Sequence, residues 1–226
     1  MAAVLLDAGG VLIMPSPGRA RAALGVDVED AVLDQAHYRA TAATDAHPPR
    51  ERMRYMRTFV ETCGFPPEER EAAAARLYEV YDGANFILRS PLAGAEALDA
   101  LTALPVAFGV VSNAVGTVAR HLREAKVCQV GPGPGLPVEF VIDSALVGVE
   151  KPDPAIFELA FARLGIGAER SVYVGDTARI DVDGAHAAGM RALHLDPYGD
   201  CPDPPGHHEH VRSLADLARW VGDHVA

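Results

Sequence analysis

The sequence predicts an α/β protein with a doubly wound parallel sheet into which an all-helical unit is inserted. In the second half of the chain, short apolar runs alternate with helical patterns, as in a parallel sheet covered by helices on both faces. From residue 19 to about residue 88, by contrast, helical patterns follow one another without a convincing strand. We therefore expect an α/β domain formed by residues 1–14 and 90–226, and a helical unit formed by residues 15–89.

The first strand is the apolar run of residues 4–6, which ends abruptly in Asp7 and is followed by Gly9 and Gly10. This pattern indicates a buried strand that delivers a carboxylate at its C-terminal end and then turns tightly. Active sites of open α/β sheets lie beyond the carboxyl ends of the strands. Asp7 is therefore a candidate nucleophile or metal ligand, although an aspartate that only caps a loop would give the same local pattern.

The helical unit follows a turn-rich segment at residues 14–18. Apolar spacing predicts helices over residues 28–43, 50–63 and 67–81. The second of these carries four arginines that could meet an anionic group, although a solvated face is the favoured explanation: Arg50, Arg52, Arg54 and Arg57.

The remaining elements alternate between strand and helix. Further strands are predicted at residues 106–111, 140–142, 171–174 and 193–195. Apolar spacing predicts helices over residues 92–101 and 115–122. A third helix is predicted to begin at Asp153-Pro154, and a fourth to end at Gly189. A last helix is predicted to follow a capping box formed by Ser213 and Asp216. A glycine- and proline-rich surface loop is expected at residues 131–135. Four strands end in a polar residue, namely Asp7, Ser112, Asp143 and Asp176, of which we expect Asp143 to be structural.

Composition excludes some classes of partner. The chain has 31 acidic and 20 basic residues, and this net charge of −11 argues against a nucleic acid or an anionic membrane surface as a partner. Three scattered cysteines form neither a disulfide framework nor a zinc ligand set, and they favour reduced thiols in a cytoplasm. We expect no secretory signal and no membrane span. The histidine-rich segment at residues 207–210 is expected to be a solvated loop rather than a metal site.

The candidate functional residues converge on one edge of the predicted sheet. They are Asp7, Ser112, Lys151, Asp176 and Asp181. A carboxylate can attack phosphorus, and the transferring phosphoryl group needs cationic and hydrogen-bonding contacts. Mg²⁺ prefers hard oxygen ligands, which two carboxylates and a carbonyl supply. Lysine adds a compact positive charge, and Ser112 before a helix adds a hydroxyl and free N–H groups.

In their order and spacing, four segments resemble the signatures of the haloacid dehalogenase (HAD) superfamily of hydrolases. They are DAGGVL at residues 7–12, VVSN at 110–113, VEKPDPAIF at 149–157 and VGDT at 174–177, the last continuing through Asp181 to Gly184-Ala185 and Ala188-Gly189-Met190. The resemblance covers roughly residues 1–14 and 90–196. It implies a Rossmann-like core with an inserted helical cap, and a Mg²⁺-dependent phosphatase that acts on a small phosphorylated metabolite through an aspartyl-phosphate.

The resemblance also implies a role for each matching position. Asp7 would be the nucleophile and would hold Mg²⁺ together with the carbonyl of Gly9, Asp176 and Asp181, while Asp181 could instead orient Lys151. The residues implied to contact the phosphoryl group are Ser112, Asn113, Lys151 and Gly10.

One departure from the family pattern concerns the general acid. Phosphatases of this superfamily usually carry a second aspartate two positions after the nucleophile, and here that position is Gly9. General acid–base help contributes about 10²–10⁴-fold to rate, so we expect slow turnover of poor leaving groups unless another group donates the proton. The possible donors in the helical unit, each expected to be an ordinary surface residue, are Asp45, His37 and His47.

Two alternative functions stay open. A metal-independent 2-haloacid dehalogenase would use Asp7 on an alkyl carbon, but dehalogenases of this superfamily generally lack an aspartate at the position of Asp176. A non-catalytic phosphate-binding or regulatory protein would keep the scaffold without the general acid that Gly9 replaces.

Overall fold

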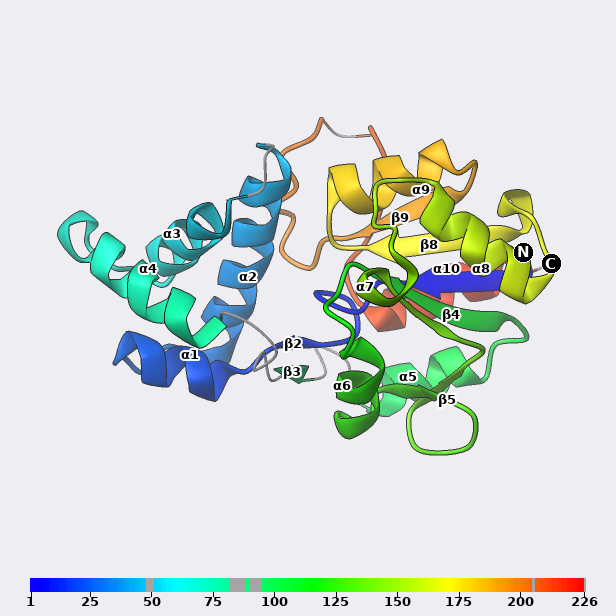
Figure 1. Ribbon diagram of the computed structural model, residues 1–226, viewed down its shortest axis with the longest axis horizontal. Coiled ribbons are helices and arrows are strands. Elements are labelled where there is room, and N and C mark those ends of the chain that lie inside the picture. Colours follow the sequence, from blue (N-terminus) through cyan, green and yellow to red (C-terminus); the bar gives the residue numbers. More distant parts are fainter. Residues whose placement is uncertain (48–50, 82–87, 90–94, 205, 226) are drawn as a thin grey trace.

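The structure is a computed structural model of the 226-residue chain, and it describes residues 1–47, 51–81, 88–89, 95–204 and 206–225. A six-stranded sheet with flanking helices forms one part of the molecule, and a group of helices stands beside it (Figure 1). The predicted boundary at Ser90 and Pro91, and also Arg50 and Leu92, lie outside the described residues.

All pairings in the main sheet are parallel, and the strand order is β10-β9-β8-β1-β4-β7. The strands are β1 (Ala3–Leu6), β4 (Ala107–Ser112), β7 (Val141–Asp143), β8 (Ser171–Gly175), β9 (Arg191–Leu195) and β10 (Glu209–Val211). Successive strands are added on one side of β1 first and then on its other side, so the order reverses between β1 and β8. The doubly wound parallel sheet predicted from the sequence is confirmed.

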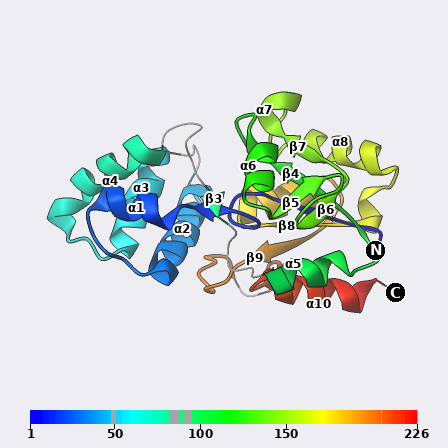
Figure 2. The ribbon, with the colours of Figure 1, turned by 90° about the horizontal axis from the view of Figure 1, so that it is seen from below.

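Helices cover both faces of the sheet, as Figures 1 and 2 show. Val4 and Leu6 of β1 share a hydrophobic cluster with α5 (Ala95–Thr102), α6 (Val118–Glu124) and α10 (Leu214–His224). Leu5 faces the opposite way and packs in the cluster that contains α8 (Ala155–Leu164), the π-helical turn η2 (Ala178–Asp183) and α9 (Gly184–Ala187). Burial on both faces explains why β1 is an uninterrupted apolar run.

The second group of helices has a hydrophobic cluster of its own. It consists of α1 (Pro17–Leu24), α2 (Asp30–Asp45), α3 (Arg52–Thr62) and α4 (Pro67–Tyr81), and we refer to it as the cap. The three predicted helices of this region are present with shifts of about two residues, but α1 was not predicted. Pro17 stands in the first turn of α1, where its missing N–H breaks no helical hydrogen bond. The proline- and glycine-rich composition of residues 14–18 therefore indicates a turn although a helix begins there.

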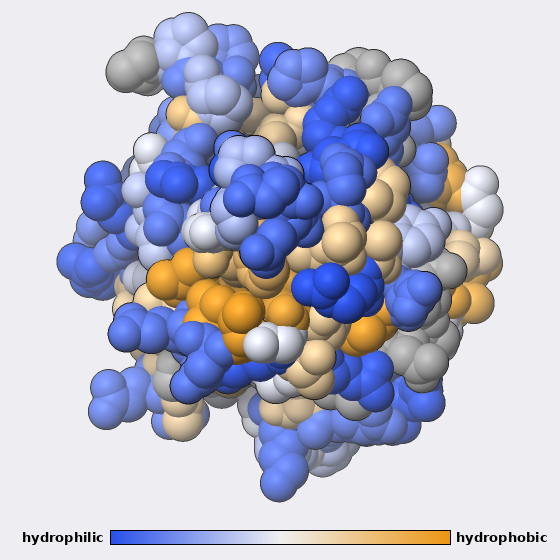
Figure 3. All heavy atoms as spheres, turned by 90° about the vertical axis from the view of Figure 1, so that its left-hand side faces the viewer, coloured by the Kyte–Doolittle hydropathy of each residue, from blue (hydrophilic) through white to orange (hydrophobic). Residues whose placement is uncertain are grey.

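The chain leaves the sheet and returns to it through two short antiparallel strands, β2 (Met14–Pro15) and β3 (Leu88–Arg89). Between these crossings, α2 is the cap helix that meets the sheet-containing part. Tyr38 donates from its hydroxyl to the carbonyl of Gly10 (2.7 Å), and Arg39 pairs with Asp200 (2.9 Å). Seen from its outer side, the cap is mostly hydrophilic with an apolar patch (Figure 3).

Smaller elements complete the structure. A second parallel pair, β5 (Cys128–Val130) and β6 (Leu136–Val138), flanks the exposed glycine–proline loop, and α7 (Ser144–Val147) and the short helix η1 (Ala168–Arg170) follow. Asp143 is structural as expected, because its carboxylate accepts from the N–H groups of Gly116, Val118 and Ala145. None of the helices in the described ranges is long and apolar enough for a membrane span.

The expectation of a solvated loop at residues 207–210 is wrong in part. Glu209 begins β10, and the side chain of His208 is only 1% exposed. The segment has no apolar run, so pattern reasoning could not find a three-residue edge strand there.

Candidate active site

Asp7 lies where β1 ends, at the point where the strand order reverses. Its N–H donates to the carbonyl of Val174 in β8 (2.8 Å), which continues the sheet by one residue. Its carboxylate oxygen Oδ1 accepts from the N–H of Ala8 (2.7 Å) and lies 3.1 Å from Nζ of Lys151. The switch point of a doubly wound sheet is the usual ligand site, and the central strand places Asp7 there.

Lys151 is buried at the centre of a polar network. Its Nζ donates to Asp181 Oδ1 (2.6 Å) and to the hydroxyl of Tyr173 (2.7 Å), in addition to its contact with Asp7. Asp181 is equally buried, and its Oδ2 accepts from the N–H (3.0 Å) and the hydroxyl (2.5 Å) of Thr177. Both oxygens of Asp181 therefore already accept hydrogen bonds within the protein.

Asp176 follows β8 and faces Asp7 across the same edge. Oxygens of Asp7, Asp176 and Asp181 lie within 4.8 Å of one another. Gly10 adopts a left-handed φ of 70°, and a Cβ atom built there would lie 2.0 Å from Asp176 Oδ2. Only glycine allows the Asp176 carboxylate to come this close to the loop after β1.

His37 of α2 reaches the same cluster from the cap. Its Nε2 lies 3.7 Å from Asp176 Oδ2, and its Nδ1 is 2.7 Å from the hydroxyl of Tyr55. His37 Nε2 is buried without a hydrogen-bond partner among the described residues. Burial raises the pKa of Tyr55 well above 10, so the phenol stays protonated and is able to donate to Nδ1. In that arrangement the His37 proton sits on Nε2, facing Asp176.

The charges of the cluster shift the pKa values of its members. Burial raises the pKa of Asp7 to about 6, with smaller opposing effects from the Lys151 ammonium, which lowers it, and from Asp181 and Asp176, which raise it. Burial is the largest single effect on both groups and favours neutral Lys151 and protonated Asp181. Their mutual attraction, added to their other charge and hydrogen-bond contacts, outweighs burial, so the pKa of Lys151 is raised and that of Asp181 is lowered. Three carboxylates thus share one lysine, which leaves the site deficient in positive charge.

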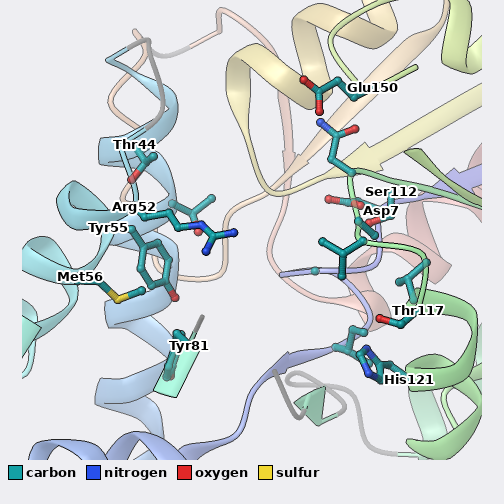
Figure 4. A pocket seen from close by; sticks show the side chains of 17 residues that line it. Asp7, Thr44, Arg52, Tyr55, Met56, Tyr81, Ser112, Thr117, His121 and Glu150 are labelled. Carbon is teal, nitrogen blue, oxygen red and sulfur yellow. The ribbon is translucent and has the colours of Figure 1, made fainter. Parts of the chain in front are cut away.

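A cavity of about 690 Å³ opens above Asp7, between the sheet and the cap (Figure 4). On the sheet side Asp7, Ser112 and Thr117 face it, and on the cap side Arg52 and Tyr55 do. The cavity is large enough for a small organic molecule and joins the carboxylate cluster to residues of the cap.

Comparison with known proteins agrees with this geometry. The model of the "haloacid dehalogenase-like hydrolase" family matches residues 1–189. The chain belongs to the haloacid dehalogenase-like hydrolase family. Among HAD relatives, a phosphoserine phosphatase of Thermus thermophilus is 33% identical over 157 residues, which is 67% of this chain and 56% of that protein. A phosphoglycolate phosphatase of Rhodospirillum rubrum is 32% identical over 142 residues, which is 58% of this chain and 56% of that protein.

These matches span little more than half the length of the two curated HAD relatives. Among solved structures, the 2-haloacid dehalogenase of Pseudomonas syringae pv. Tomato superposes with a TM-score of 0.56 at 24% identity. That superposition covers 97% of this chain and 99% of the dehalogenase. It extends the HAD fold over the cap as well as the sheet.

The structure brings the predicted HAD positions to one edge of the sheet, and two of the residues implied to contact the phosphoryl group also make hydrogen bonds within the protein. The side-chain amide of Asn113 donates to the backbone carbonyl of Lys151 and accepts from the backbone N–H of Lys151 (2.8 Å each). These two hydrogen bonds hold the lysine segment in place. The N–H of Gly10 donates to the carbonyl of Ile13 (3.0 Å). Gly9 and Ser112 line the cavity together with Asp7.

The cap residues considered as proton donors differ from the expectation of ordinary surface residues. His37 and Asp45 are buried, and Asp45 accepts from the N–H groups of Arg179 (2.8 Å) and Ile180 (3.3 Å) at the start of η2. His47 is exposed and bonds its own helix at the carbonyl of Ala43, as expected for a surface residue.

Among the described arginines of the cap, Arg52 lines the cavity, whereas Arg57 pairs with Glu71 on the surface.

Tyr173 is the residue of the network that pattern reasoning missed. It stands in the middle of β8, where it resembles any other apolar strand residue, yet its hydroxyl touches Lys151 and lies 3.0 Å from Asp181 Oδ1. A fully buried tyrosine needs a partner for its hydroxyl, and that requirement was the available signal.

Proposed function

We propose that the protein is a Mg²⁺-dependent phosphohydrolase that hydrolyses a small phosphorylated metabolite through a phosphoryl group carried on Asp7. The observation that carries the proposal is the meeting of Asp7 and Asp176 at the switch point of the sheet, with Lys151 beside them. Its family membership and the phosphatase activities named for its curated relatives support the same class of reaction.

The residues of the site fit a magnesium ion. Carboxylate oxygens are the ligands that Mg²⁺ prefers, and a second cation would balance the negative charge that Lys151 leaves uncompensated. Asp7 and Asp176 are the side chains we assign to the ion, because both oxygens of Asp181 are already occupied by hydrogen bonds. Bound Mg²⁺ would draw negative charge from the phosphoryl oxygens and orient the phosphate.

The chemistry divides into two displacements at phosphorus. Asp7 Oδ1 already accepts two hydrogen bonds, so Oδ2 is the oxygen we assign to the attack on phosphorus, which breaks the ester bond and releases the alcohol. Lys151 and Ser112 would then contact the phosphoryl oxygens as charge develops on them. A water molecule next attacks phosphorus, frees inorganic phosphate and restores the Asp7 carboxylate.

Proton transfer to the leaving alcohol is the step for which this chain departs from its family. A Cβ atom at Gly9 would meet nothing within 4 Å, so the position of the usual acid is open space beside the cavity. His37 is the buried cap residue that faces the cluster with an unoccupied nitrogen. We assign to it either direct protonation of the leaving group or the orientation of Asp176.

Phosphate release from a panel of small phosphate esters tests the proposal. We expect turnover with Mg²⁺, none after EDTA treatment, and recovery when Mg²⁺ is added back. Asp7→Asn and Asp176→Asn should abolish it, while Asp183→Asn, which changes an exposed carboxylate on η2, should not. Absence of turnover on every ester with Mg²⁺ present would refute the proposal, and metal-independent halide release from 2-chloropropionate would favour a dehalogenase.

A further inference from the structure

A second group of potential metal ligands lies outside the active-site cavity. His194 of β9, Cys201 of the following loop, and His208 and His210 at the start of β10 each place one ligand atom within 4.8 Å of all the others. Residues at these positions come from two neighbouring parallel strands and the segment that joins them. The single cysteine and three histidines have none of the regular spacings of zinc motifs. For this reason residues 207–210 are expected from the sequence to form a solvated loop rather than a metal site, and the grouping in the structure differs from that expectation.

The distances within the group suit a tetrahedral ion. His194 Nδ1 lies 3.0 Å from His208 Nε2, and Cys201 Sγ lies 3.5 Å from the same nitrogen. With metal–nitrogen bonds of about 2.0–2.1 Å and metal–sulfur bonds of about 2.3 Å, a tetrahedron places its ligand atoms roughly 3.3–3.6 Å apart. Imidazole and thiolate together favour zinc over magnesium or calcium, which prefer oxygen.

The surroundings of His194 fix which of its nitrogens faces the group. Nε2 lies 3.1 Å from the backbone carbonyl of Asp176, and a carbonyl only accepts, so Nε2 carries the proton. Nδ1 therefore presents a bare lone pair toward His208 and Cys201. A metal-bound histidine typically donates its other N–H to a carbonyl or carboxylate in this way.

Carboxylates surround the other ligands. Asp196 Oδ2 lies 3.6 Å from His210 Nδ1, and Asp203 Oδ2 lies 3.9 Å from His208 Nδ1. Asp196 also accepts from the N–H groups of Asp200 (3.0 Å) and Cys201 (3.2 Å), which folds the loop back toward β9. The group thus has two carboxylates close to its histidine rings, in addition to the hydrogen bond of His194 to the Asp176 carbonyl.

We propose that His194, Cys201, His208 and His210 form a structural Zn²⁺ site that fastens the loop after β9 to the sheet. The same loop contacts the cap, because Asp200 accepts from Arg39 and Gln35, and Tyr198 donates to the carbonyl of Ala31 (3.1 Å). It runs beside α2 in Figure 1. Zinc would therefore order the surface against which the cap rests.

Cobalt substitution tests the site through a thiolate-to-cobalt absorption band, which the carboxylate cluster around Asp7 is unable to produce because it contains no sulfur. The full chain, made without a histidine tag and freed of metal under reducing conditions, is titrated with Co²⁺ while excess Mg²⁺ occupies oxygen ligands. We expect one equivalent of Co²⁺ to give the strong visible bands of a tetrahedral complex and a thiolate-to-cobalt charge-transfer band. Zn²⁺ should bleach both, and protein purified without chelator should contain one equivalent of zinc by elemental analysis.

Variants decide which residues bind. Cys201→Ser should remove the charge-transfer band, and both it and His208→Ala should weaken binding more than about tenfold. Cys63→Ser, which changes a half-buried thiol of the cap, should keep the wild-type spectrum. His207→Ala should keep it too, since His207 belongs only to an alternative group with Asp203 and His208.

Three results would overturn the proposal: no thiolate band in the wild type, a band that persists in Cys201→Ser, or a band lost equally in His207→Ala. If His208→Ala fails to fold, the spectrum of Cys201→Ser alone decides whether the site exists, because this variant changes a single atom from sulfur to oxygen.

Discussion

Replacing Gly9 by aspartate should raise the rate of the proposed phosphohydrolase reaction. The position tolerates a side chain, because a Cβ atom there meets nothing within 4 Å and the backbone is not left-handed. The free energy of unfolding should therefore change by no more than about 0.5 kcal/mol. The new carboxyl would stand two residues after Asp7, beside the cavity where the leaving group departs.

The size of the gain follows from general acid catalysis. A positioned acid contributes about 10²–10⁴-fold when the leaving group needs a proton, and much less when it does not. We therefore expect kcat of Gly9→Asp to rise by about 10²-fold or more on an alkyl phosphate. On p-nitrophenyl phosphate, whose leaving group departs as a stable anion, the gain should be smaller. Steady-state phosphate release on both substrates measures the difference.

Two control variants make the comparison decisive. Gly9→Asn has nearly the same shape without the acid, and Gly9→Ala reports the cost of a side chain alone. Equal rates for Gly9→Asp and Gly9→Asn on the alkyl phosphate would refute the reasoning that the missing acid limits turnover. Activity confined to Gly9→Asp would instead identify the natural chain as a phosphate-binding protein.

Three further predictions concern the carboxylate cluster. Gly10→Ala forces a left-handed residue and a contact of 2.0 Å with Asp176, so urea denaturation should show a loss of more than about 1 kcal/mol, in contrast to Gly9→Ala; equal stability of the two variants would contradict the geometry. Lys151→Met leaves buried Asp181 and Asp7 without their cation, so urea denaturation should show a free energy of unfolding lower by about 3–5 kcal/mol. An unchanged free energy of unfolding would contradict a stabilising role of this ion network. The folded pKa of Asp7, about 6, exceeds its ordinary value of 3.8, so its contribution to stability is full below about pH 3.8 and is lost as pH rises through about 6. In metal-free protein, Asp7→Asn should accordingly be more stable than the wild type at about pH 8, by on the order of 3 kcal/mol, with the advantage shrinking toward about pH 4; a pH-independent difference would argue against a buried, ionised Asp7.

Local pattern was sufficient for the main elements because they are regular. Strand β1 is an uninterrupted apolar run, and the buried residues of the helix over Pro67–Tyr81 recur at helical spacing, so each pattern matches its environment. The convergence of Asp7 and Asp176 also followed from topology, since both stand at carboxyl ends of neighbouring parallel strands. Motif resemblance then supplied Lys151, which lies in no regular element.

Contacts between distant segments could not be predicted in the same way. The orientation of α2 decides that His37 faces Asp176 and that His47 faces solvent, and nothing in the local sequence distinguishes these two histidines. The side-chain amide of Asn113 is hydrogen-bonded to the backbone of Lys151, 38 residues further along the chain. Such pairings depend on the packed tertiary structure, and a single sequence records neither the packing nor the partner.

The neighbouring positions of β2 and β3 have a consequence for how this molecule could be rebuilt. Met14 pairs with Arg89, so the chain departs from the sheet and comes back to it at adjacent points. A foreign segment with ends equally close together could replace the whole excursion without altering the order of any strand. We therefore expect that grafting the excursion of another hydrolase onto this sheet would change the substrate range and leave Asp7 and Asp176 in place.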